Sequence, residues 1–287
     1  MQFCTAIHIA TEYGGTAMNG SVALAVTHHD PEQRMERQIA QWLPVLQQYY
    51  AHLAIIVTAD TNYNAWITPA AALSVQQLPA QFPAGMAALG QIRQMVVQQA
   101  WQHAPHISHV HLCDFDRILH WVAHYPVELA HVVAHITRAD LTVLGRTPRA
   151  FATHPRTQRD TESLINHVFE LASGQAWDVT AASRGLSRRA SAYLAERCAD
   201  PTVGVDCAWV LCALQQPELV VAYSATEGLE FETADRYPAE IAAAGSVSAW
   251  IATLDASPQQ WLQRLQVAML EVASINQFGD HAQCGER

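Results

Sequence analysis

Three short, mainly apolar runs separated by helical patterns constrain the fold of this chain more than any other feature. They cover residues 21–27, 53–58 and 107–113. A parallel strand is buried on both faces by helices, so it reads as a nearly continuous apolar run. Apolar residues recur at helical spacing between the first two runs, and again within 86–102 before the third. This order predicts an α/β fold with a mainly parallel, Rossmann-like central sheet flanked by helices.

The rest of the chain is expected to continue this pattern and to end in helices. Residues 61–85 are expected to form a long irregular connection, and residues 146–159 a basic loop. Further strands are expected at 141–145, 219–223 and 229–232, and further helices at 117–124, 127–136, 162–172, 188–197, 207–214 and 257–275. Because the strands end before Tyr237, we expect an α/β domain over residues 1–237 and a C-terminal helical extension over 238–287.

The chain contains no lysine: apart from histidine, its sixteen basic residues are all arginines. Schiff-base and pyridoxal-phosphate catalysis need a lysine amine, and the Walker phosphate-binding loop needs its lysine. These classes are therefore excluded. Any phosphate group bound here must contact arginine, backbone N–H groups or a metal ion.

Net charge and cysteine usage restrict the partners and the compartment. The formal net charge of −10 argues against a surface that coats nucleic acid. No apolar run has the length of a membrane span, and the N-terminus lacks the charged-then-apolar pattern of a signal sequence. The six cysteines include no Cys-x-x-Cys pair, so we expect reduced thiols and a cytoplasmic protein.

Two aspartates one residue apart directly follow the third apolar run. Asp114 and Asp116 flank Phe115, where a buried strand is expected to give way to a loop. Ligands of open α/β sheets bind outside the carboxyl ends of the strands. Mg²⁺ and Mn²⁺ prefer oxygen ligands and bridge readily to phosphate. The pair is therefore a candidate metal clamp for a diphosphate; the alternative is that both aspartates cap the next helix.

The order of these features resembles the GT-A class of nucleotide-sugar glycosyltransferases, in particular its family-2-like members. The shared features are a first strand ending in a polar turn, a second ending in aspartate, an arginine-bearing helix, and a strand ending in Asp-x-Asp; they lie within residues 21–232. In that class the nucleotide lies across the first strands and the Asp-x-Asp motif holds a divalent metal. The resemblance implies a GT-A-type fold, a nucleotide diphosphate sugar as donor, and Mg²⁺ or Mn²⁺ as cofactor.

The resemblance also implies binding residues at the ends of the first two strands. Thr27 and His28 are expected to line the nucleoside pocket, and Asp60 to face the base. The alternatives are that His28 is only a turn residue and that Asp60 only terminates its strand in an Asx turn.

Around the Asp-x-Asp motif, the resemblance implies three further contacts. Asp114 is expected to contact the ribose or the metal, and Asp116 the metal itself. Arg93, on the preceding helix, is expected to lie near the diphosphate or to brace the aspartates. A lone buried arginine is costly without a carboxylate partner, which favours pairing with Asp114 or Asp116. The alternative is a surface arginine.

Residues 205–209 resemble the segment that carries the acceptor base in inverting GT-A enzymes. Asp206 is expected to remove the proton from the acceptor hydroxyl, although Val205 stands where the common form has a second acidic residue. The alternative is an ordinary helix cap. Upstream, Arg184 in a glycine-containing loop is expected to contact phosphate or sugar hydroxyls, with a plain interhelical turn as the alternative. The late histidine that gives many relatives a further metal ligand has no counterpart.

Three further groups of polar residues leave more than one interpretation open. The pairs His120/His124 and His131/His135 have the i, i+4 spacing that suits zinc, but without a clear third ligand a histidine-rich surface is favoured. Four arginines are interpreted either as an anion-binding lip or as part of a solvated loop: Arg146, Arg149, Arg156 and Arg159. Four acidic residues are interpreted either as a sugar- or metal-binding hairpin or as an exposed acidic hairpin: Glu227, Glu230, Glu232 and Asp235.

The sequence thus predicts a cytoplasmic, metal-assisted and inverting glycosyltransferase that acts on a small-molecule or glycan acceptor. The first alternative is a nucleotidyltransferase of the same fold. Such enzymes usually carry a glycine-rich loop with arginine and lysine after the first strand, where this chain has Thr-His-His-Asp at 27–30. The second alternative is a non-catalytic binding protein of the same fold.

Overall fold

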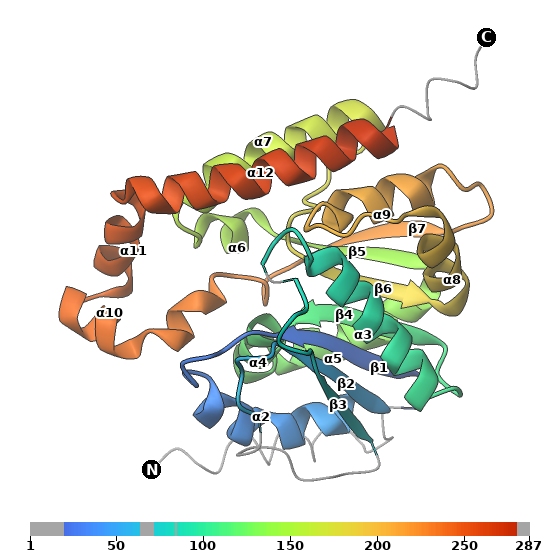
Figure 1. Cartoon of the computed structure of the whole chain (residues 1–287), viewed down its shortest axis with the longest axis horizontal. Coiled ribbons are helices and arrows are strands. Elements are labelled where there is room, and N and C mark those ends of the chain that lie inside the picture. Colours follow the sequence, from blue (N-terminus) through green and yellow to red (C-terminus); the bar gives the residue numbers. More distant parts are fainter. Residues whose placement is uncertain (1–19, 64–71, 84, 280–287) are drawn as a thin grey trace.

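The computed structural model describes residues 20–63, 72–83 and 85–279, and its centre is one seven-stranded sheet (Figure 1). The strand order is β3-β2-β1-β4-β6-β5-β7. β6 is antiparallel to its neighbours β4 and β5, whereas the other neighbouring strands pair in parallel. The strands are β1 (Val22–His28), β2 (His52–Val57), β3 (Leu73–Gln77), β4 (His109–Asp114), β5 (Leu141–Arg146), β6 (Ser183–Ser187) and β7 (Val221–Thr226). The expected α/β fold with a mainly parallel sheet is confirmed.

Helices and two 3₁₀ turns connect the strands. The helices are α2 (Glu36–Tyr49), α3 (Leu89–His103), α4 (Phe115–His124), α5 (Pro126–His135), α6 (Pro148–Ala152), α7 (Arg156–Ser173), α8 (Arg188–Arg197), α9 (Val205–Leu214), α10 (Pro238–Ala244), α11 (Val247–Asp255) and α12 (Pro258–Gly279). The 3₁₀ turns are η1 (Ile136–Arg138) and η2 (Glu232–Arg236).

Both faces of the sheet are buried, because alternate side chains of a strand point to opposite faces. In β1, Leu24 and Val26 belong to a core cluster that includes side chains of α2, α4 and α5. Ala23 and Ala25 belong to a second cluster that includes side chains of α3, α8 and α9. This double burial explains the apolar runs from which β1, β2 and β4 were predicted.

β6 replaces the loop that the sequence indicated around Arg184. Its five residues are buried, and the strand pairs with β4 on one side and β5 on the other. Glycine is required at position 185, since a Cβ atom there would lie 2.5 Å from the side chain of Ile136. The short Ser-Arg-Gly-Leu-Ser segment has little strand propensity of its own, so pairing on both edges determines its conformation.

The expected basic loop at residues 146–159 is mostly helical. Thr147 caps α6, because its side-chain oxygen accepts a hydrogen bond from the Ala150 N–H (3.1 Å), and Pro148 occupies the first helical position. Pro155 directly precedes α7, which begins six residues before its expected start. The arginines of this stretch therefore lie mainly on helices and not on one solvated loop.

The structure also differs from the connection expected at residues 61–85 and from the strand expected at residues 229–232. β3 lies within the region 61–85 that was expected to be irregular; residues 64–71 and 84 of that region lie outside the described residues. The strand expected at 229–232 is not formed; these residues lead from β7 into η2. The acidic residues of this stretch are thus carried by a loop and a 3₁₀ turn instead of a hairpin.

The C-terminal helices pack back onto the α/β part of the chain. α12 runs beside α7 and also contacts α9 (Figure 1). Its buried side chains include Ala268, Ile275 and Phe278, which belong to the same core cluster as α3 and α9. Within the described part of the chain, every helix is too short or too polar to cross a membrane.

Candidate functional site

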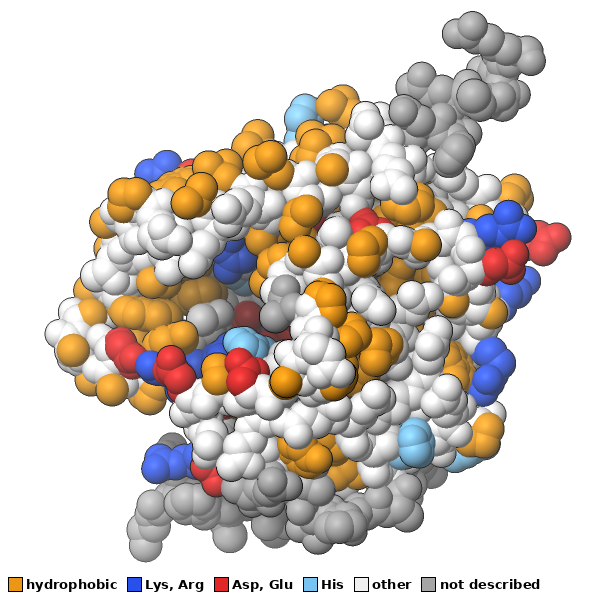
Figure 2. All heavy atoms as spheres, in the orientation of Figure 1, with side chains coloured by type: hydrophobic (Ala, Val, Ile, Leu, Met, Phe, Trp, Pro, Cys, Tyr) orange, Lys and Arg blue, Asp and Glu red, His pale blue; other side chains and the backbone are white. Residues whose placement is uncertain are grey.

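The chemically important residues meet at one edge of the sheet. Because β1, β2 and β4 are parallel and in register, with Thr27 opposite Asp114 and His28 opposite Val57, their carboxyl ends lie side by side. The segment after β7 returns across this edge and brings η2 to α4. Figure 2 shows acidic, basic and histidine side chains around a hollow of the molecular surface. A ligand-binding edge was expected here from the strand order along the chain.

Asp114 is held at the end of β4 by three side chains. Its carboxylate accepts hydrogen bonds from Arg93 (3.2 Å) and Thr27 (3.3 Å), and Arg117 Nε lies 3.8 Å away. Burial alone would raise the pKa of Asp114, but Arg93 and Arg117 outweigh it and hold the pKa below its ordinary value. Asp114 is the residue before α4, yet its side chain makes no capping hydrogen bond. The capping alternative therefore fails for Asp114.

Asp116 lies in the first turn of α4, beyond the strand end. Its Oδ2 is 3.4 Å from Arg236 Nη1, and its Oδ1 accepts a hydrogen bond from the Arg117 N–H (2.9 Å). Burial, together with the charges of Glu232 and Asp114, raises the pKa of Asp116 to about 6. Arg236 and Arg117 oppose this shift without cancelling it. Burial and the two neighbouring carboxylates therefore outweigh the two arginines at Asp116.

Two arginines and two further acidic residues complete this group. Arg117 Nε lies 3.4 Å from the Glu232 carboxylate, and Arg236 Nη2 lies 3.7 Å from Asp30. Glu232 Oε2 is buried and has no hydrogen-bond partner among the residues that the structure describes. We define the carboxylate–arginine cluster as Asp30, Asp114, Asp116, Glu232, Arg93, Arg117 and Arg236.

Asp206 joins this cluster through Arg93. The Arg93 guanidinium is 2% exposed and donates to Asp206 (2.7 Å) from one terminal nitrogen and to Asp114 from the other. Asp206 lies in the first turn of α9, and its side chain is 7% exposed. The expected pairing of Arg93 with an aspartate of the motif is confirmed, and the surface-arginine alternative is excluded.

Arg184 is placed differently from its expected position in a ligand-binding loop. The side chain is buried and donates to the backbone carbonyls of Asp206 (2.8 Å), Ser183 (2.7 Å) and Val179. Burial lowers the pKa of this guanidinium. Arg184 thus links β6 to the start of α9, where it supports the placement of Asp206.

The residues expected to bind the nucleoside lie at the ends of β1 and β2. Thr27 contacts Asp114, and His28 is buried with its ring edge-on to Phe115, 5.2 Å between ring centres. Burial lowers the pKa of His28 to about 4, so the ring is neutral at pH 7. Asp60 is exposed beyond β2 and accepts a hydrogen bond from Thr58 (2.6 Å).

The four arginines that were considered as one anion-binding lip do not act together. Arg146 is buried and donates to both oxygens of Asp178 at 2.7 and 2.9 Å. Arg149 is half exposed and contacts Glu227 and Glu230. Arg156 and Arg159 belong to α7, where Arg156 pairs with Asp160. These pairings favour structural roles.

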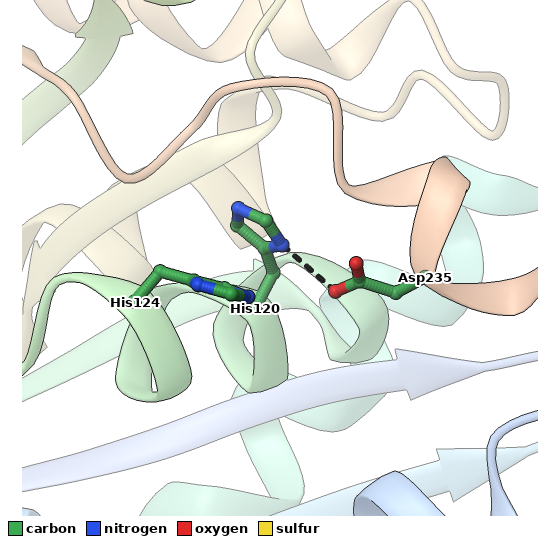
Figure 3. A group of neighbouring side chains, drawn as sticks. All are labelled: His120, His124 and Asp235. Carbon is green, nitrogen blue, oxygen red and sulfur yellow. Dashed lines mark hydrogen bonds and ion pairs between the residues drawn. The ribbon is translucent and has the colours of Figure 1, made fainter. Parts of the chain in front are cut away.

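A second group of titratable side chains lies between α4 and η2. His120 Nδ1 is 2.8 Å from Asp235 Oδ2, and the rings of His120 and His124 are 4.4 Å apart (Figure 3). The i, i+4 spacing of the histidines was visible in the sequence. The third group, Asp235, was not assignable to them, because it reaches α4 only through the return of the chain after β7.

Comparison with known proteins adds no identification. No protein-family model matches the chain, and no curated protein matches it. The chemistry of the site must therefore be inferred from the side chains that the fold brings together.

Proposed function

We propose that the protein is a metal-assisted glycosyltransferase of GT-A architecture, which transfers a sugar from a nucleotide diphosphate donor to a small-molecule or glycan acceptor. The observation that carries this proposal is the carboxylate–arginine cluster at the carboxyl ends of β1 and β4. It combines oxygen ligands for a hard cation with arginines, the only strongly basic side chains in this chain. The mixed, mainly parallel sheet is compatible with the proposed architecture.

The cluster fits a divalent cation bound by Asp114 and Asp116. Burial raises the pKa of Asp116, the charges of Glu232 and Asp114 raise it further, and the buried Glu232 Oε2 has no hydrogen-bond partner among the described residues. A cation relieves both conditions. When bound, Mg²⁺ or Mn²⁺ would supply charge neutralisation for the departing nucleoside diphosphate.

The arginines of the cluster have different roles in this proposal. Arg93 is buried between two carboxylates, so it braces Asp114 and does not contact the donor. The side chain of Arg236 is 21% exposed beside Asp116, where its fork can contact a diphosphate oxygen. Thr27 and His28 line the adjoining end of β1, which suits a neutral nucleoside better than a charged group.

A thermal-shift panel of nucleoside diphosphates and nucleotide sugars tests donor binding. We expect a nucleoside diphosphate to stabilise the protein more in Mn²⁺ than in EDTA. At a hundredfold excess over its dissociation constant in Mn²⁺, the ligand should contribute roughly 2.7 kcal/mol of unfolding free energy. Asp116→Asn is expected to remove most of the metal-dependent part, measured against the variant's own ligand-free unfolding temperature. Asp160→Asn, which changes an exposed aspartate on α7, is the matched control.

Two outcomes would overturn the proposal, one from this panel and one from incubation of the protein with a nucleoside triphosphate and a sugar phosphate. Absence of a shift with every nucleotide would favour the alternative of a non-catalytic protein of the same fold. Binding of a nucleoside triphosphate together with a sugar phosphate, and formation of a nucleotide sugar from them, would favour a nucleotidyltransferase.

Asp206 is the proposed acceptor base, and its turnover test must separate catalysis from stability. Asp206→Asn is expected to lower sugar transfer by roughly a hundredfold or more, while Mn²⁺-dependent nucleotide binding persists. The reason is that a base must accept a proton from the acceptor hydroxyl, whereas asparagine retains only a neutral oxygen beside Arg93. Unchanged turnover in a folded variant would exclude Asp206 as the base, and loss of folding would identify Asp206 as a structural partner of Arg93.

The proposed compartment is the cytoplasm. The four cysteines within the described residues are buried and form no disulfide: Cys113, Cys198, Cys207 and Cys212. This supports reduced thiols, as the Cys spacing in the sequence indicated.

A further inference from the structure

A metal-ligating group separate from the proposed donor site lies between α4 and η2. His120 and His124 occupy successive turns of α4, and Asp235 approaches them from η2 (Figure 3). One ligand atom from each of the three residues lies within 4.8 Å of the others. The three side chains differ in exposure: His120 is buried, whereas His124 and Asp235 are accessible to solvent.

We propose that His120, His124 and Asp235 form a binding site for a borderline divalent transition-metal ion, with Zn²⁺ as the ion that fits best. Two imidazole nitrogens and one carboxylate oxygen are a ligand set of zinc sites, with a fourth position left for water or another ligand. Tetrahedral zinc ligands lie about 3.3 Å apart, as follows from Zn–N and Zn–O bonds of about 2.0–2.1 Å. The accessible His124 and Asp235 side chains can close the remaining separation by rotamer changes, while His120 stays fixed.

The surroundings of His120 are those of a supported metal ligand. Its Nδ1 faces Asp235, and its Nε2 lies 3.2 Å from Glu230 Oε1. Glu230 is itself held by Tyr125 (2.9 Å) and Arg149 (2.6 Å). A carboxylate that accepts from the second ring nitrogen fixes the tautomer and orientation of a zinc-bound histidine. Nδ1 of His120 is therefore the coordinating atom in the proposed site, and Glu230 its hydrogen-bond acceptor.

The second histidine pair of the chain shows that spacing alone does not make such a site. His131 and His135 have the same i, i+4 spacing on α5. Among the described residues, however, the group with Asp235 is the one arrangement of three or more such side chains close enough to share an ion. The acidic residue from η2 thus distinguishes the α4 pair from the α5 pair and supplies a matched control.

Zinc at this site would connect two distant parts of the chain. Asp235 is on the same 3₁₀ turn as Glu232 and Arg236, which contact Arg117 and Asp116 of the carboxylate–arginine cluster. The ion would therefore hold η2 against α4. The ligand set also separates this site chemically from the proposed donor site, because imidazole favours zinc whereas carboxylates alone favour Mg²⁺ or Mn²⁺.

Calorimetric titration of the full chain with Zn²⁺, after treatment with a chelator and its removal, tests the proposal. We expect one Zn²⁺ bound per chain at this site, with affinity reduced roughly tenfold or more in His124→Ala and in Asp235→Asn. His131→Ala is expected to bind as the wild type does. Co²⁺ in place of Zn²⁺ should give the visible absorption of a four-coordinate ion in the wild type and in His131→Ala, and lose it in the two ligand variants.

The same titration can overturn the proposal. Equal Zn²⁺ affinity in the wild type and His124→Ala, or equal losses in His124→Ala and His131→Ala, would exclude this site. His124 is exposed, so His124→Ala is expected to keep the metal-free unfolding temperature of the wild type, and Asp235→Asn gives an independent second variant. Nucleotide binding is not needed for any of these readouts, so failure of the proposed glycosyltransferase activity would leave them interpretable.

Discussion

The side chain of Arg93 shows how this fold keeps ionised groups buried. One guanidinium donates to Asp206 on α9 and to Asp114 on β4. A buried charge is tolerated only with such partners, because removal of one partner leaves the other charge uncompensated. Arg93 thus connects a strand end with a helix start, and Arg184 reinforces the connection through the Asp206 carbonyl. The planar fork of arginine can serve two carboxylates at once, which a lysine ammonium does less well.

Asp116 is expected to give the stability of the protein a pH dependence that asparagine abolishes. Its folded pKa of about 6 exceeds the ordinary value of 3.8. Stability from protonated Asp116 is therefore fully present below pH 3.8 and is lost as the pH rises through about 6. The unfolding free energy of Asp116→Asn, relative to that of the wild type, should therefore increase by about 1 to 3 kcal/mol when the pH is raised from 4 to 8.

Denaturant unfolding of both proteins at the two pH values, without metal or nucleotide, measures this gain. Asp160→Asn on the surface of α7 controls for the loss of one carboxylate elsewhere. If the difference in unfolding free energy between the wild type and Asp116→Asn were the same at both pH values, the pKa of Asp116 would not be raised in the folded protein.

At the scale of elements, α12 is expected to be an integral part of the fold. Ile275 is 2% exposed in the core cluster shared with α9, whereas Met269 on the same helix is 73% exposed. Ile275→Ala should therefore cost about 2–5 kcal/mol of unfolding free energy, and Met269→Ala less than about 0.5 kcal/mol. Chemical denaturation of the two variants makes the comparison. If both variants lowered the unfolding free energy by similarly small amounts, α12 would contribute little to the stability of the core that it shares with α9.

Whether an element could be predicted depended on whether its conformation leaves a pattern in its own residues or follows from its neighbours in the fold. β1, β2 and β4 were predicted within two residues of their observed bounds, because burial on both faces leaves an apolar run in the sequence. β6 could not be predicted, because its order comes from pairing with β4 and β5 and not from its own residues. The helices within 146–159 were not predicted, because the arginines of this stretch suggested a basic loop. The cap at Thr147 is a local helix signal that covers only a few residues.

The same distinction holds for the candidate site. Asp114 and Asp116 were recognisable because they directly follow a strand, and Arg93 because a buried arginine needs an acidic partner. Arg236 was not recognisable, and Asp235 was considered as a metal or sugar ligand but could not be assigned to the histidines of α4, since nothing near these residues in the sequence indicates that η2 lies on α4. Such contacts between distant segments follow from the path of the whole chain, which local patterns do not specify.

At the scale of the whole molecule, η2 belongs to both proposed sites. Asp235 faces the histidines of α4, while the next residue, Arg236, contacts Asp116 and Asp30. The 3₁₀ turn is short and is held mainly by these polar contacts, because Glu232 is its one buried residue. A ligand that fixes η2 at one site therefore also fixes it at the other.

This arrangement leads to a final prediction, which rests on both proposals: zinc and the nucleoside diphosphate should bind cooperatively. Zinc would hold η2 in the position that presents Arg236 to the diphosphate, so the second ligand need not order this turn again. We expect zinc to raise nucleotide affinity about fivefold or more, and the nucleotide to raise zinc affinity by the same factor, since coupling between two binding sites is reciprocal.

Calorimetric titration of the nucleoside diphosphate in Mn²⁺, with and without one equivalent of Zn²⁺, measures the coupling. In His124→Ala the zinc effect should disappear while nucleotide binding in Mn²⁺ persists, because His124 lies outside the carboxylate–arginine cluster. Persistence of the effect in His124→Ala would mean that zinc acts directly at Asp114 and Asp116. Equal affinities with and without zinc in the wild type would show that η2 holds the same position at the donor site whether or not Asp235 binds a metal.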